Sequence, residues 1–154
     1  FYYHYIFCYF LGDNKMAREM AIAMKKKTGK KIFSIPCMDE INLEDLKFGD
    51  KQLYDVGPSE FLSYIKNAAY VITDSFHGVA LSINLEKEFV AIENVENPER
   101  VKHLLNELGL ENRIDLDVDE YNTIDYKSVS EKVNCSRIDT KNWVLEAVKS
   151  TNIH

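Results

Sequence analysis

Apolar residues occur in short continuous runs that are separated by polar segments. The run at residues 5–11 is apolar throughout and rich in aromatic residues, which is typical of a strand buried on both faces in a parallel sheet. Shorter runs of the same kind predict strands at residues 31–35, 70–73 and 88–93, and a last strand at residues 113–116. The chain therefore has enough strand signals for one sheet.

Helical spacing of apolar residues follows most of these runs. After the first strand Asp13 is a predicted N-cap, and Lys25, Lys26 and Lys27 precede Gly29, as expected at the negative end of a helix dipole. Further helices are predicted at residues 57–69, 76–84, 97–109, 126–133 and 138–149. Strands and helices thus alternate along the chain.

The segment at residues 38–56 interrupts the alternation, because it is acidic and irregular, with one helical turn predicted near residues 43–46. We interpret this segment as an excursion over the surface. Apolar spacing also predicts which helical side chains face the core. These are Phe61, Leu62, Ile65 and Ala69 in the helix from Gly57, and Val129, Val133, Trp143, Leu145 and Val148 in the two closing helices.

This alternation predicts an α/β fold, namely a Rossmann-like three-layer sandwich with a mostly parallel sheet. In such sheets, ligands bind beyond the carboxyl ends of the strands. Three polar segments should meet at that edge, at residues 12–14, 74–78 and 94–100. The candidate chemistry of the chain is concentrated in these segments.

Composition narrows the function classes. With 45% hydrophobic and 29% charged residues, the chain fits one globular domain over residues 1–154. The 19 Lys and Arg against 25 Asp and Glu give a net charge of −6, which argues against a nucleic-acid-binding surface. Three scattered cysteines predict neither a disulfide framework nor a zinc site, and no metal or transmembrane segment is expected.

His77 lies where the strand at residues 70–73 passes into a helix. The first N–H groups of a helix can bind an anion, Ser75 adds a hydroxyl, and Gly78 permits close approach of a ligand or of neighbouring backbone. A histidine can donate a proton near neutral pH, because its ordinary pKa is about 6.5. The local sequence leaves a second interpretation equally open, in which His77 caps the helix and does no chemistry.

The neighbouring residues have simpler interpretations. Asp74 is predicted to be a turn or cap residue, and Phe76 a core anchor. Asn14 lies in a loop compatible with ligand binding, although this loop lacks the glycine spacing of a dinucleotide-binding motif. Arg100 falls in the first turn of its helix, where its charge opposes the dipole, which indicates either an anionic ligand or a solvated face.

Two longer stretches carry a family resemblance. The stretch GPSEFLSYIKNAAYVITDSFHGVALSINLEKEFVAI, followed by NPERVKHLLNELGLENR, resembles the polysaccharide pyruvyl transferase family. The pattern that carries the resemblance is the ordered set of the strand, Ser75-Phe76-His77-Gly78, a helix of small residues, and a Leu-Gly-Leu motif that ends at Arg113. Both ends of the chain also look like the C-terminal half of that family, so the resemblance covers nearly the whole chain.

The resemblance implies the C-terminal Rossmann-like domain of a GT-B-like, two-domain enzyme. Members transfer the enolpyruvyl unit of phosphoenolpyruvate to a sugar, which forms a pyruvate ketal and releases phosphate. The motif histidine corresponds to His77, which is implied to contact the donor and to act as general acid. Further substrate contacts are expected from Ser75, Phe76, Gly78, Asn14, Arg100 and Arg113.

The same resemblance implies the partners. These are phosphoenolpyruvate, with no separate cofactor, a glycan acceptor of the cell envelope or its lipid-linked precursor, and an N-terminal domain of the same chain. The chain begins at Phe1, so we expect a longer cytoplasmic protein, either free or peripheral at the inner membrane, and an inactive isolated fragment. Some members carry an arginine where this chain has Ser75, so the donor charge would need Arg100, Arg113 or an arginine of the N-terminal domain.

Two other functions remain open. One is a GT-B glycosyltransferase that binds a nucleotide sugar. Glu88 and Glu96 have the Glu-x7-Glu spacing often seen there, but Glu88 is predicted to lie at the start of its strand, away from the ligand edge. The other is a non-catalytic domain that binds an anionic sugar or metabolite.

Overall fold

The fold is built on one parallel sheet. In the computed structural model, which describes residues 5–37, 47–93 and 98–151, five strands are arranged in the order β3-β2-β1-β4-β5. Their bounds are β1 Tyr5–Tyr9, β2 Lys31–Ile35, β3 Lys51–Gln52, β4 Tyr70–Thr73 and β5 Phe89–Ala91. Every neighbouring pair is parallel, so the carboxyl ends of the strands share one edge.

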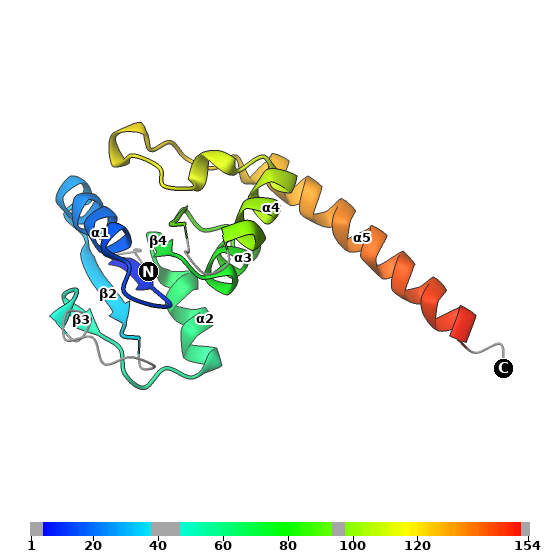
Figure 1. Ribbon diagram of the computed structural model, residues 1–154, viewed down its shortest axis with the longest axis horizontal. Helices are drawn as coiled ribbons and strands as arrows, with labels where there is room; N and C mark the ends of the chain where they lie inside the picture. The colour runs from blue at the N-terminus through cyan, green and yellow to red at the C-terminus, as the bar shows by residue number, and fades with distance from the viewer. Residues whose placement is uncertain (1–4, 38–46, 94–97, 152–154) are drawn as a thin grey trace.

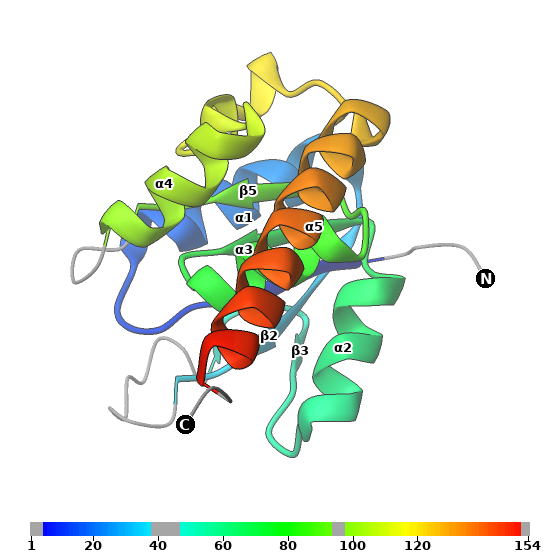
Figure 2. The ribbon, with the colours of Figure 1, turned by 90° about the vertical axis from the view of Figure 1, so that its right-hand side faces the viewer.

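Helices cover both faces of the sheet (Figures 1 and 2). One face packs on α1 (Lys15–Thr28) and on the short 3-10 helix η3 (Val118–Glu120). The other face packs on α2 (Pro58–Asn67), α3 (Phe76–Asn84), α4 (Pro98–Leu108) and the first turns of α5 (Tyr126–Thr151). The prediction of a Rossmann-like three-layer α/β sandwich is confirmed.

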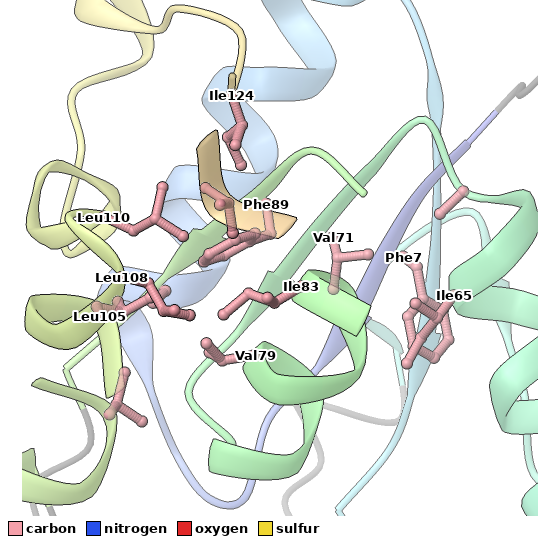
Figure 3. Close-up of a cluster of buried hydrophobic side chains, with 14 of the residues drawn as sticks. Phe7, Ile65, Val71, Val79, Ile83, Phe89, Leu105, Leu108, Leu110 and Ile124 are labelled. Atoms are coloured by element: carbon pink, nitrogen blue, oxygen red, sulfur yellow. The ribbon is translucent and has the colours of Figure 1, made fainter. Parts of the chain in front are cut away.

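Alternating strand side chains supply the two halves of the core. Ile6, Cys8 and Ile72 point toward α1, whereas Phe7 and Val71 point toward α2 and α3, because successive residues of a strand face opposite sides. Figure 3 shows the second cluster, in which Val79 and Ile83 of α3 extend toward the sheet and toward side chains of α4. This packing anchors α3 on β4, and therefore determines where His77 lies.

The cap of α1 differs from the prediction. Asn14, not Asp13, is the N-cap residue, because the Asn14 side-chain oxygen accepts a hydrogen bond from the Ala17 backbone N–H at 3.0 Å. Asp13 instead pairs with the guanidinium of Arg18, whose side chain is largely buried. The predicted end of α1 at Gly29 is confirmed, since Gly29 is the C-cap residue and adopts a left-handed conformation with φ of 68°.

The edges of the sheet also differ from the prediction. The segment at residues 113–116 was predicted to be a strand, but it begins as the end of the 3-10 helix η2 (Glu111–Arg113), and only Ile114 pairs, as an isolated bridge to Ala91. The two-residue strand β3 lies in the segment predicted to be irregular. The helical turn predicted at residues 43–46 lies outside the described residues.

The C-terminal part of the chain forms one helix where two were predicted. No glycine or proline occurs between Val133 and Ile138, so α5 continues unbroken for 26 residues and extends away from the body (Figure 1). Val129 is buried as predicted. Trp143, Leu145 and Val148 were predicted to be in the core, but they are exposed, Trp143 by 70%, because the distal part of α5 extends beyond the sheet layers. None of the helices in the described part of the chain is long and apolar enough to span a membrane.

The prediction for α2 holds in part. Ile65 is fully buried against the sheet, and Phe61 is partly buried at the end of the helix near the carboxyl edge. Leu62 was expected on the same buried face, but 43% of its surface is exposed. It lies beside a groove at the carboxyl edge, as described below.

Candidate active site

The central strands bring two of the predicted polar segments together. β1 and β4 are neighbours and pair Tyr9 with Thr73, so the turns that follow them emerge side by side. The Asp74 carboxylate accepts hydrogen bonds from the Leu11 backbone N–H at 2.8 Å and from the Asn14 side-chain amide at 3.2 Å. The loop at residues 12–14 is thereby attached to the turn at residues 74–78, as predicted.

Asp74 and Asn14 hold this edge in shape. Asp74 is only 4% exposed, and its two described hydrogen bonds are directed into the protein. A buried carboxylate is costly without such donors, so the prediction of a turn residue is supported. Asn14 uses its side-chain oxygen to cap α1 and its amide nitrogen to bind Asp74, which commits both polar atoms of the side chain.

Ser75 also has a structural partner. Its side-chain oxygen caps α3 by accepting a long hydrogen bond, at 3.5 Å, from the Gly78 N–H, and the residue is only 1% exposed. The Ser75 N–H donates to the Thr73 hydroxyl, which in turn donates to the Tyr9 carbonyl oxygen at 2.6 Å. The Ser75 hydroxyl could still donate a hydrogen bond, but its burial leaves almost no surface for the predicted contact with a substrate.

Gly78 is required by packing against β4. A Cβ atom at this position would lie 2.5 Å from the Thr73 hydroxyl oxygen and 2.8 Å from the Thr73 methyl carbon. The close approach that the sequence suggested is therefore to a neighbouring side chain of the protein. It allows the first turn of α3 to lie directly on the end of β4.

His77 is the exposed member of this turn. Its neighbours Asp74, Ser75 and Gly78 are buried, whereas the imidazole makes no hydrogen bond with any described residue. The ring contacts Phe76 edge-to-face, with 5.9 Å between centroids. The Ser75 side chain caps α3, so the prediction that His77 is the helix cap is wrong, and the His77 side chain is exposed at the carboxyl edge.

Arg100 is brought to the same place from α4. Its guanidinium carbon lies 4.4 Å above the centroid of the Phe76 ring, which is a cation–π contact. Among the described residues, Arg100 has no carboxylate partner. Phe76, predicted as a core anchor, is half-buried and separates two groups that can carry positive charge, His77 and Arg100. Residues 94–97, the start of the third predicted segment, lie outside the described residues.

Arg113 is not brought to this edge. It is 2% exposed and donates to the Asn122 carbonyl and side-chain oxygens at 2.6 and 2.9 Å. Its Nη1 lies 3.9 Å from the carboxylate of Glu88, which precedes β5, so the cluster lies toward the amino ends of the strands. The Nε and Nη1 groups have no hydrogen-bond partner within the described part of the chain.

Glu88 is engaged by contacts within the protein. It accepts hydrogen bonds from the Tyr121 hydroxyl and from the Ile124 backbone N–H. Burial, and then the hydrogen bond to Glu88, raise the pKa of the Tyr121 hydroxyl above its ordinary range. Glu88 lies at the edge opposite His77, as predicted, and Glu96 lies outside the described residues.

Sequence reasoning did not find the groove that lies on the other side of His77. The groove has a volume of about 550 Å³, and its walls include Tyr9, Phe61, Leu62 and Leu81. These residues come from one strand and two helices, so no local sequence signal joins them. Across the described residues, no group of three His, Cys, Asp or Glu side chains could hold a metal ion.

A comparison with models of protein families gives a match. Residues 1–97 match the family model described as polysaccharide pyruvyl transferase. The matched region contains all five strands and the turn that carries His77, and it ends before Arg100. No curated protein matches the chain.

Proposed function

The chain belongs to the polysaccharide pyruvyl transferase family, and we propose that its donor is phosphoenolpyruvate and that His77 is the general acid of the transfer. The acceptor is a sugar of a cell-surface polysaccharide or of its lipid-linked precursor. The observation that carries the proposal is the exposure of His77 in the first turn of α3, at the carboxyl edge of the sheet, while its neighbours are buried.

The chemistry requires an acid beside a bound anion. His77 would protonate the methylene carbon of phosphoenolpyruvate, which leaves an oxocarbenium-like centre at the adjacent carbon. A sugar hydroxyl then forms a C–O bond to that carbon and loses its proton. Cleavage of the C–O bond to phosphate releases the leaving group, and a second hydroxyl closes the ketal. The two sugar hydroxyls release two protons. One restores the proton that His77 gave to the methylene carbon, and the other leaves with phosphate.

The anion would lie against the start of α3 and Arg100. The Ser75 side chain accepts a hydrogen bond from the Gly78 N–H. The backbone N–H groups of Phe76 and His77 come before Gly78, at the positive end of the helix, where an anion can bind. The helix dipole alone contributes only about 0.3–1 kcal/mol, so a cation is needed as well. Arg100 is the candidate for this cation, because Arg113 lies at the opposite edge of the sheet. Arg100 would supply the positive charge that some family members carry as an arginine at the position of Ser75.

A phosphate-release assay tests the acid. The full-length protein is supplied with phosphoenolpyruvate and a panel of glycan acceptors, and His77→Ala should lower kcat by roughly 10²- to 10⁴-fold. The matched control is His103→Ala, since His103 is an exposed histidine on α4 whose imidazole lies 3.3 Å from Glu107. Unchanged phosphate release in His77→Ala would show that His77 is not the acid.

Donor identity and donor binding are tested separately. Phosphoenolpyruvate, and not a nucleoside diphosphate, should raise the melting temperature of the protein; the reverse preference would favour a glycosyltransferase. Arg100→Met should raise the KM for phosphoenolpyruvate on the order of 10-fold or more, because a charge-assisted contact contributes about 1.5–3 kcal/mol. Arg137→Met, a change in an exposed arginine of α5, is the control, and equal KM values in both variants would contradict the role of Arg100.

A further inference from the structure

The groove beside His77 lies between α2 and α3. The side chains of Tyr9, Phe61, Leu62 and Leu81 are aromatic or aliphatic, and His77 also lines the groove. Tyr9 and Phe61 pack edge-to-face, with 5.0 Å between ring centroids. A volume of about 550 Å³ falls in the range of small-ligand sites, which is roughly 300–1,000 Å³.

The composition of the walls excludes the donor from this groove. No Lys or Arg is among its described lining residues, and His77 is the only one of them that can carry a positive charge. Phosphoenolpyruvate carries a carboxylate and a phosphate, and buried anions need paired charges or several hydrogen-bond donors. A pyranose ring fits better, because its C–H face is apolar while its hydroxyls lie at the rim.

The helical geometry of α3 separates two sides of His77. His77 and Leu81 are four residues apart, so they lie on one face of the helix, and both line the groove beside α2. Phe76 is turned toward α4, because Arg100 of α4 lies over its ring. His77 therefore lies between two different surroundings. Arg100, stacked on Phe76, lies toward α4, and the apolar groove lies toward α2.

We propose that this groove binds the acceptor sugar, with its apolar face against Tyr9, Phe61 and Leu62 and its reacting hydroxyls toward His77. The proposal rests on the proposed function, because the transfer requires the acceptor oxygen and the protonated donor carbon to meet beside the same acid. It assigns the acceptor to the α2 side of α3 and the donor to the α4 side.

Leu62 provides a test that spares the fold. It is 43% exposed, and Leu62→Gln should raise the KM for the acceptor roughly five- to tenfold, since it removes apolar contact area, while the KM for phosphoenolpyruvate stays unchanged. Ile22→Gln is the matched control, because Ile22 is 44% exposed on α1 and does not line the groove. Equal acceptor KM values in Leu62→Gln and Ile22→Gln would overturn the assignment.

A binding measurement separates this proposal from the donor chemistry. In the full-length protein with methyl-labelled leucine, a methyl hexopyranoside from a panel should give nuclear Overhauser contacts from its ring protons to the methyl groups of Leu62 and Leu81. If these contacts are seen but phosphoenolpyruvate is not turned over, the assignment of the groove to a sugar is supported and the assignment of phosphoenolpyruvate as donor is refuted. Turnover with the sugar contacting other methyl groups, or none, would refute the groove and leave the donor assignment intact.

Discussion

The sharpest structural prediction concerns Gly78→Ala. The added Cβ would lie 2.5 Å from the Thr73 hydroxyl oxygen and 2.8 Å from its methyl carbon, whereas ordinary contacts begin at 3.4 Å. Relief requires the two groups to separate by nearly an ångström. Thr73 cannot yield freely, because it is fully buried and its hydroxyl donates to Tyr9 and accepts from Ser75. The strain must therefore displace the first turn of α3, which carries His77.

The cost follows from overpacking and from the hydrogen bonds of Thr73. Overpacking in a close-packed core costs about 1–3 kcal/mol, and a weakened internal hydrogen bond adds about 0.5–1.5 kcal/mol. We expect the free energy of unfolding to fall by roughly 2–4 kcal/mol. At about 2–4 °C per kcal/mol for a domain of this size, the melting temperature should fall on the order of 4–16 °C.

Calorimetry or circular dichroism of the purified variants measures this loss. The control is Gly12→Ala on the same edge of the sheet, where a Cβ would meet nothing within 4 Å and the backbone needs no left-handed conformation. Gly12→Ala should leave stability unchanged or raise it slightly. In the double variant with Thr73→Ala, most of the clash disappears, so Gly78→Ala should cost less there than in the wild type. An unchanged melting temperature in Gly78→Ala alone would refute the reasoning.

Three further predictions concern residues away from the edge that carries His77. The hydrogen bond from Lys25 lowers the pKa of Asp50, so its stabilisation is present above pH about 4 and is lost as the pH falls through the lowered value. Asp50→Asn should therefore lower the melting temperature near pH 7 by an amount that vanishes in acid titration, and a pH-independent difference would contradict this. Arg113→Met removes two hydrogen bonds to Asn122 and the cation beside Glu88, so it should lower stability by about 1.5–3 kcal/mol and leave the KM for phosphoenolpyruvate unchanged; a selective rise in that KM would place Arg113 at the donor after all. Deletion after residue 141 removes the exposed distal turns of α5, so the melting temperature should stay within a few degrees, and a large loss would show that these turns are packed against something.

The central elements could be predicted from the sequence because their signals are local. The helix Phe76–Asn84 was predicted with both ends, since a small polar cap precedes a run of helically spaced apolar residues. Strands β2 and β4 were predicted with equal accuracy, because buried parallel strands are continuous apolar runs. The segment at residues 113–116 misled the prediction because its alternating apolar residues, Ile114 and Leu116, indicate partial burial and do not identify the strand that would pair with them.

The distal part of α5 also shows that a local sequence pattern does not determine whether a helix face is buried. Trp143, Leu145 and Val148 have the composition of a buried face, and helical periodicity places them on a helix correctly. Whether a helix face meets a core depends on where the sheet ends, which no window of sequence contains. The exposed side chains therefore had to be found in the tertiary structure.

The sequence by itself determined the alternation of the central strands and helices, and with it the parallel sheet whose carboxyl edge carries the turn at residues 74–78, because periodicity, caps and chain connectivity are local properties. Only the tertiary structure decided the roles within that edge. It committed Ser75, Gly78 and Asn14 to capping and close packing, left His77 exposed, brought Arg100 over Phe76 and placed Arg113 at the opposite end. The physical reason is that burial and hydrogen-bond partners depend on which distant segments meet, and that is set by the packing of the whole domain.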